Sequence, residues 1–310
     1  MTRIDLITGF LGSGKTTFLK KYVKYLISKG ERICILENDY GAINVDMMLL
    51  QEFNNICDME MVAGGCDFDC HKRRFKTKLI AMGMKGYDRV IIEPSGIFDT
   101  DEFFDTLYEE PLDSWYEIGS VISILDPAVK NNISAESEYV LINQISSSGK
   151  IIISKTDEYN DNEIDDTINY LNCLMTKYNM HLDKNIILRK HYDDYTEEDY
   201  EAIKRASYRS EAHEKMNIME VNKYSSIYFM NTGFKLDELK AKANILFNDQ
   251  SFGNIMRIKG FLKDNDKWLE FNMTKEILNV NELSNGQDVV IIIGEGISEA
   301  KIKEFLGRDE

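Results

Sequence analysis

Two hydrophobic patterns alternate along the first half of the chain. Short runs rich in Val, Ile and Leu are typical of buried strands, and they occupy residues 3–10, 32–39, 87–96, 118–126 and 149–157. After the first run, residues 15–30 place Phe18, Leu19, Val23 and Leu26 at helical spacing and end at a glycine. Nearly continuous apolar strands separated by helices predict an α/β fold with a mostly parallel sheet covered on both faces. Such sheets bind their ligands at the carboxyl ends of the strands.

The pattern changes in the last third of the chain. Residues 160–215 are typical of charged helices and loops, and they carry no recognisable site motif. Strand-like runs then follow at residues 225–234, 254–263, 267–273 and 288–296, with helical patterns at 236–247 and 298–306. Strands flanked by segregated helices predict a small α+β domain. We therefore expect a first domain over residues 1–215 and a C-terminal domain over residues 216–310.

Composition excludes several classes of partner. The chain has 310 residues and a formal net charge of −16, which argues against a nucleic-acid-binding surface because phosphates require a basic footprint. Its five cysteines are too few and too dispersed for a disulfide framework. No run approaches the ~18 apolar residues of a membrane span, and the strand pattern begins too early to leave room for a signal peptide. We expect a cytoplasmic protein without nucleic-acid or membrane partners.

The first strand leads into a phosphate-binding motif. GFLGSGKT, residues 9–16, matches the P-loop pattern G-x-x-x-x-G-K-[ST] between a strand and a helix. We expect its backbone N–H groups and the helix N-terminus to bind nucleotide phosphates. The residues concerned are Gly9, Gly12, Ser13, Gly14, Lys15, Thr16 and Thr17. Lys15 is predicted to reach the β- and γ-phosphates, and the Thr16 hydroxyl to ligate Mg²⁺.

Two other strands end in residues that complement a P-loop. Glu93 ends one apolar run, where an acid holds Mg²⁺ directly or through water, or orients the attacking water. Gly96 follows it and would let its N–H approach the γ-phosphate. Ser154, Lys155 and Asp157 end another run in the sequence SKTD, close to the Asn-Lys-x-Asp pattern that recognises guanine. The Asp157 carboxylate would accept hydrogen bonds from guanine N1–H and N2–H, a pair of donors that adenine lacks.

The stretch GGCDFDCHKRR, residues 64–74, concentrates groups that bind transition metals. Cys66 and Cys70 are predicted to form a labile site for Zn²⁺ or a neighbouring metal, since soft sulfur ligands favour such ions. Asp67, Asp69 or His71 would supply a third ligand, and His71 is the weakest of these candidates. Two alternatives stay open: an ordinary polar turn without metal, and a redox pair of thiols. Cys57 is ambiguous, whereas Cys34 and Cys173 are expected to be buried as small hydrophobic residues.

These motifs, taken in order, resemble those of the CobW-type GTPases. The ordered set is the P-loop, ENDYGAINVD (residues 37–46), the Gly65–Cys66 turn, IIEPSG (residues 91–96) and SKTD, and RIKGFL (residues 257–262) resembles the start of the small C-terminal domain of that family. The resemblance implies a P-loop NTPase fold and a Mg²⁺-dependent GTPase that serves transition-metal delivery or a metalloenzyme client. It implies a switch role for Asp39, because Asn38-Asp39-Tyr40-Gly41 stands where the family has Asn-Glu-Phe-Gly.

The resemblance is incomplete at the thiols. The family motif is Gly-Cys-x-Cys-Cys, and Phe68 and Asp69 occupy the positions of its last two cysteines. Alternatives are a client-activating GTPase that binds no metal itself, and a P-loop small-molecule kinase. A kinase would use adenine and mobile arginines, and would leave SKTD and the Gly-Cys turn without a role. A nucleotide-dependent homodimer is also open. His181 and His191 are isolated, and we expect surface or structural roles for both.

Overall fold

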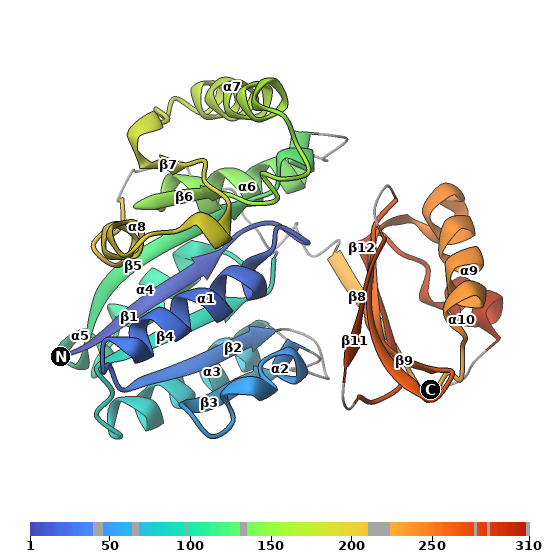
Figure 1. The fold of residues 1–310 in the computed structure, drawn as a ribbon, viewed down its shortest axis with the longest axis horizontal. Coiled ribbons are helices and arrows are strands. Elements are labelled where there is room, and N and C mark those ends of the chain that lie inside the picture. The colour runs from blue at the N-terminus through green and yellow to red at the C-terminus, as the bar shows by residue number, and fades with distance from the viewer. Residues whose placement is uncertain are drawn as a thin grey trace. The chain divides into compact units, whose positions relative to one another are not determined.

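The computed structural model describes residues 1–39, 46–63, 68–96, 98–130, 135–209, 224–275, 278–283 and 286–307. The chain divides into two compact units, Met1–Glu214 and Lys215–Glu310, and each is described by itself (Figure 1).

The first unit is built on a seven-stranded sheet. Its strands are β1 (Thr2–Thr8), β2 (Ile33–Asp39), β3 (Asp58–Ala63), β4 (Arg89–Pro94), β5 (Tyr116–Leu125), β6 (Lys150–Ile153) and β7 (Ile187–Leu188). Their order is β3-β2-β4-β1-β5-β6-β7, and all the pairings are parallel. The predicted α/β class with a mostly parallel sheet is therefore confirmed. The structure adds β3 and β7, which the hydrophobic pattern did not reveal because most of β3 is only partly buried and β7 has two residues.

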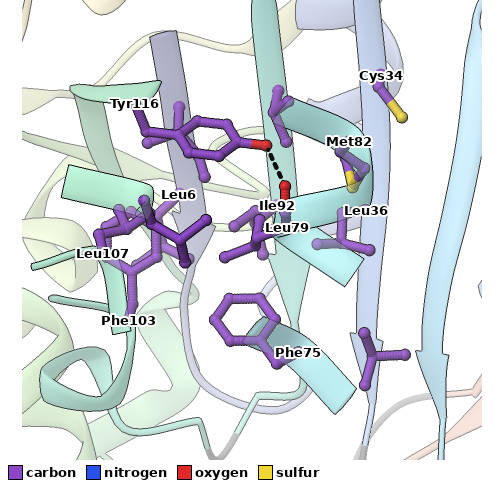
Figure 2. Packing of buried hydrophobic residues seen from close by; sticks show 14 of the residues in the cluster. Leu6, Cys34, Leu36, Phe75, Leu79, Met82, Ile92, Phe103, Leu107 and Tyr116 are labelled. Atoms are coloured by element: carbon purple, nitrogen blue, oxygen red, sulfur yellow. Dashed lines mark hydrogen bonds between the residues drawn. The ribbon is translucent and has the colours of Figure 1, made fainter. Parts of the chain in front are cut away.

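Helices cover both faces of this sheet. They are α1 (Lys15–Ser28), α2 (Asp46–Leu49), α3 (Phe68–Gly83), α4 (Thr100–Leu107), α5 (Leu112–Trp115), α6 (Ala135–Ser146), α7 (Asp161–Lys177) and α8 (Glu197–Lys204). Alternate residues of the strands enter different cores. Leu6 and Ile92 pack with α3, α4 and α5, whereas Ile7 and Ile91 pack with α1 and α8. Figure 2 shows the first of these cores, in which the Tyr116 hydroxyl donates to the Leu79 carbonyl over 2.8 Å.

The structure shows how far Cys34, Cys57 and Cys173 are buried. Cys34 is fully buried, as expected. Cys173 is exposed, so the expectation of burial was wrong. The buried face of α7 runs through Ile164, Leu171 and Met175, and Cys173 lies on the opposite side of the helix. Cys57 is half-buried at the start of β3, and burial raises the pKa of its thiol to about 11.

The second unit holds a five-stranded sheet. Its strands are β8 (Tyr224–Met230), β9 (Asn254–Asp264), β10 (Lys267–Met273), β11 (Leu278–Leu283) and β12 (Val289–Glu295), in the order β11-β10-β9-β12-β8. All the pairings are antiparallel. Helices α9 (Leu236–Asn248) and α10 (Glu299–Leu306) pack on the same side of the sheet, which confirms the predicted α+β class (Figure 1). The edge strand β11 is exposed and lacks an apolar run, so the sequence did not predict it.

An ion pair is buried inside the first unit. The Arg89 guanidinium, at the start of β4, donates to both carboxylate oxygens of Asp5 on β1 over 2.7 Å. Both side chains are almost completely excluded from solvent. The Asp5 carboxylate also accepts from the Tyr22 hydroxyl of α1 and from the Ser120 N–H of β5. Burial raises the pKa of Asp5, and the Arg89 charge acts in the opposite direction. The pair connects three strands and one helix.

Candidate nucleotide site

The P-loop joins the carboxyl end of β1 to the first turn of α1. Gly9, Gly12 and Gly14 all have positive φ angles, of 144°, 77° and 91°, which residues other than glycine rarely adopt. A Cβ atom at Gly9 would also lie 2.3 Å from the Ile124 carbonyl oxygen. Because α1 begins at Lys15, its first backbone N–H groups have no carbonyl partner within the helix. This geometry suits an anion such as a phosphate.

Lys15 and Ser13 are buried within the loop. The Lys15 ammonium donates to the Gly9 carbonyl over 3.0 Å, and the side chain is 8% exposed. Ser13 is 1% exposed, and its N–H donates to the Phe10 carbonyl over 3.1 Å. The ammonium is thus directed back to the first residue of the loop. The predicted role of Lys15 fits this position and stays a prediction.

The side chains of Thr16 and Glu93 are hydrogen-bonded to each other beside the P-loop. The Thr16 hydroxyl, in the first turn of α1, donates to one carboxylate oxygen of Glu93 over 2.7 Å. Glu93 is the penultimate residue of β4 and is 5% exposed. β4 and β1 are neighbours in the sheet, which explains why residues 77 positions apart in sequence come together. A hydroxyl and a carboxylate oxygen are ligands that Mg²⁺ accepts, so the two residues fit the predicted Mg²⁺ role.

Gly96 lies against the P-loop. A Cβ atom at Gly96 would come within 2.7 Å of the Leu11 nitrogen and 2.8 Å of the Leu11 Cα, so only glycine fits there without a shift. The preceding Ser95 N–H donates to the Asn38 carbonyl at the end of β2 over 2.8 Å. The segment after β4 is thus close to the loop that would hold the phosphates. Of Asp39, the structure describes the backbone, which ends β2; its side chain lies outside the description.

The residues predicted to contact the base follow β6. Ser154 is buried, and both its N–H and its hydroxyl donate to the Leu125 carbonyl, over 2.9 and 3.2 Å. Lys155 has a positive φ of 52° and forms an ion pair with Asp126, the residue that follows β5. These contacts fix the start of the SKTD turn on the sheet. The Asp157 side chain is 64% exposed and available to a ligand.

His191 lies beside Asp157, and the sequence did not indicate this. Its Nε2 atom is 3.5 Å from an Asp157 carboxylate oxygen. Its Nδ1 atom accepts the Asp193 backbone N–H over 3.3 Å, so the His191 ring caps the short helical turn Tyr192–Asp194. This capping contact agrees with the expected surface or structural role of His191, but the residue is not isolated, because its ring lies beside Asp157. The only signal was its position shortly after a strand, and that strand, β7, is too short to detect.

The predicted transition-metal residues fall partly outside the description. Cys66 and Asp67 are not described, nor is the side chain of Asp69. Cys70 is half-buried on α3, and His71 is fully buried with its Nε2 atom 2.8 Å from the Asn38 Oδ1 atom. Within the described ranges, no three His, Cys, Asp or Glu side chains form a group that could hold a metal ion. The described residues alone do not make a transition-metal site.

Cys57 immediately precedes β3 and Cys70 lies in the first turn of α3. The six residues of β3 span about 20 Å, so Cys57 and Ala63 lie at opposite ends of the strand.

Comparison with known proteins identifies the family. A family model described as the CobW/HypB/UreG nucleotide-binding domain matches residues 3–181. The chain belongs to this family. The zinc chaperone YeiR of Escherichia coli is 28% identical over 158 residues, which cover 51% of this chain and 47% of that protein. The zinc chaperone YjiA of the same organism is 27% identical over 161 residues, covering 50% of this chain and 49% of that protein.

The matched regions of the chain span about half the length of these two relatives. The crystal structure of Zn(II)-bound YjiA GTPase covers 100% of this chain and 99% of its own, with 17% identity and a TM-score of 0.37. Over the part of the chain that the structure describes, no helix is both long and apolar enough to cross a membrane.

Proposed function

We propose that this protein is a Mg²⁺-dependent GTPase whose nucleotide cycle is linked to the handling of a transition metal. The observation that carries the proposal is the Thr16–Glu93 hydrogen bond beside the P-loop. It lies near the carboxyl ends of the adjacent parallel strands β1 and β4. It supports a site in which phosphate-binding and Mg²⁺-binding groups converge. Family membership and the order of the motifs support the same reading.

The residues have distinct proposed roles. The P-loop N–H groups and Lys15 bind the β- and γ-phosphates, and Thr16 and Glu93 hold Mg²⁺ directly or through water. Bound Mg²⁺ neutralises charge that develops on the phosphate oxygens. Glu93 or Asp39 orients the attacking water, and Gly96 presents its N–H to the γ-phosphate. The motifs GFLGSGKT, IIEPSG and SKTD contain no arginine. We therefore expect slow intrinsic turnover, on the order of 10⁻⁴ to 10⁻² s⁻¹.

Guanine selectivity is the direct test of the nucleotide proposal. The exposed Asp157 carboxylate can accept two hydrogen bonds from guanine, and adenine offers no matching pair of donors. Charge-assisted bonds of this kind predict a roughly thirty- to hundredfold preference for GTP over ATP. The measurement is competition of both nucleotides against a fluorescent guanine nucleotide, with Asp157→Ala as the matched variant. Equal competition by ATP and GTP on the wild-type protein would refute guanine selectivity.

For the metal, we propose that Zn²⁺ or a neighbouring ion is cargo bound through Cys66 and Cys70. The zinc-chaperone relatives and the half-buried Cys70 support this assignment. We expect titration of the reduced protein with Co²⁺ to give thiolate-to-cobalt absorption that disappears in Cys66→Ser and Cys70→Ser. Exposed Cys173 provides the control, because Cys173→Ser should retain the signal. If no nucleotide state binds Co²⁺ or Zn²⁺, the protein is a client-activating GTPase without its own metal.

We also propose a metalloenzyme client. It would receive the metal from this protein, or would be activated by it during the GTPase cycle. The relatives that are named zinc chaperones support this role.

A further inference from the structure

The segment that carries Gly96 is held from α6 by two buried amide side chains. The Gln144 Nε2 atom donates to the Gly96 carbonyl over 3.1 Å and lies 3.4 Å from the Phe98 carbonyl. The neighbouring Asn143 Oδ1 atom accepts from the Thr100 N–H over 2.8 Å and from the Thr100 hydroxyl over 2.6 Å. Gln144 is 0% and Asn143 1% exposed. Two consecutive residues of one helix therefore hold Gly96 and Thr100.

The other side of the same segment contacts the nucleotide loop. Gly96 packs against the backbone of Leu11 so closely that a Cβ atom would clash with it. The Phe98 N–H donates to the Ser95 carbonyl over 3.0 Å. Because the N–H and C=O of a trans peptide point in opposite directions, this bond turns the Gly96 N–H away from Phe98. The Gln144 amide holds the Gly96 carbonyl. The Gly96 N–H therefore lies between two hydrogen-bonded carbonyls, those of Ser95 and Gly96.

The Gln144 amide is costly to bury. Among the described residues, its Oε1 atom has no hydrogen-bond partner, and an unpaired buried polar atom destabilises a fold. An apolar side chain of the same length would fill the space without that cost. The donor half of the amide, which holds the Gly96 carbonyl, gives the residue a function that an apolar side chain lacks.

We propose that Gln144 is a positioning residue that holds Gly96 for the γ-phosphate and so favours the triphosphate over the diphosphate state. The inference rests on the proposed GTPase function, in which Gly96 meets the γ-phosphate. GDP has no group that reaches Gly96, so loss of the Gln144 amide affects only the nucleotide with a third phosphate.

The test compares two nucleotides on one variant. Gln144→Met keeps the length of the side chain and removes the amide. We expect its Kd for the imido analogue of GTP to rise about tenfold and its Kd for GDP to change less than about twofold, both with Mg²⁺. Ser146→Ala is the control, because this serine is equally buried and bonds back to the Asn143 carbonyl of its own helix. Both affinities should be unchanged in the control.

The other possible results would overturn either the role of Gln144 or the GTPase proposal. Equal loss of both nucleotides, or no loss of either, overturns the role of Gln144. If the wild-type protein binds neither guanine nucleotide, the GTPase proposal itself fails, and the inference fails with it. If Gln144→Met does not fold, amide hydrogen exchange of the wild type decides. We expect residues 95–100 to be more protected with the imido analogue than with GDP, and equal protection would overturn the proposal.

Discussion

At the scale of single residues, Lys15 and Glu93 contribute to different steps of the proposed reaction. Lys15→Ala removes the ammonium that lies across the P-loop, so we expect nucleotide binding to fall by about 100-fold or more. Glu93→Gln keeps an oxygen for Thr16 but loses the negative charge. We expect its turnover to fall about 100-fold and its GDP affinity to change much less. Equilibrium binding and single-turnover hydrolysis measure the two effects, and equal losses of binding and turnover in Glu93→Gln would contradict the assignment.

The contacts of individual residues were predictable only where a motif fixes them. The P-loop motif places Thr16 in the first turn of a helix, and the apolar run that leads to Glu93 predicts a strand. Their hydrogen bond brings together two residues that were predicted to share the Mg²⁺ role. No motif relates His191 to Asp157 or Gln144 to Gly96, because these contacts depend on how loops and helices pack after the chain folds. His71 illustrates the same limit. Beside Cys70 in sequence it was a candidate ligand, yet its ring nitrogen contacts Asn38.

At the scale of elements, a buried ion pair joins α1, β1, β4 and β5. Arg89→Met would leave the Asp5 carboxylate buried without its cation, which we expect to cost about 3–5 kcal/mol in the free energy of unfolding. Adding Asp5→Asn removes the unpaired charge and keeps an acceptor oxygen for Ser120. The double variant should therefore recover part of the loss. Urea denaturation of the single and double variants measures this, and a loss below about 1 kcal/mol in Arg89→Met would show that the pair is dispensable.

The elements themselves were largely readable from the sequence. The five long apolar runs became β1, β2, β4, β5 and β6, because strands buried on both faces need continuous hydrophobic sequence. The strands that were missed, β3, β7 and β11, lie at edges, where one neighbour is lacking and polar residues are tolerated. Three of the four edge strands of the described sheets were therefore missed by hydrophobic patterning, and the fourth, β8, was predicted because it has an apolar run.

At the scale of the whole molecule, the described residues of the proposed nucleotide site all belong to the unit Met1–Glu214. This unit has its own parallel sheet and cores, and the unit Lys215–Glu310 has a separate antiparallel sheet and core. Because the unit has its own cores, we expect residues 1–214, expressed alone, to fold and to bind Mg²⁺·GDP within about twofold of the full chain. Bound GDP at about 100 times its Kd should stabilise this fragment by about 2.7 kcal/mol. Thermal unfolding with and without GDP measures the effect. A fragment that folds cooperatively but binds no GDP would show that the second unit contributes to the site.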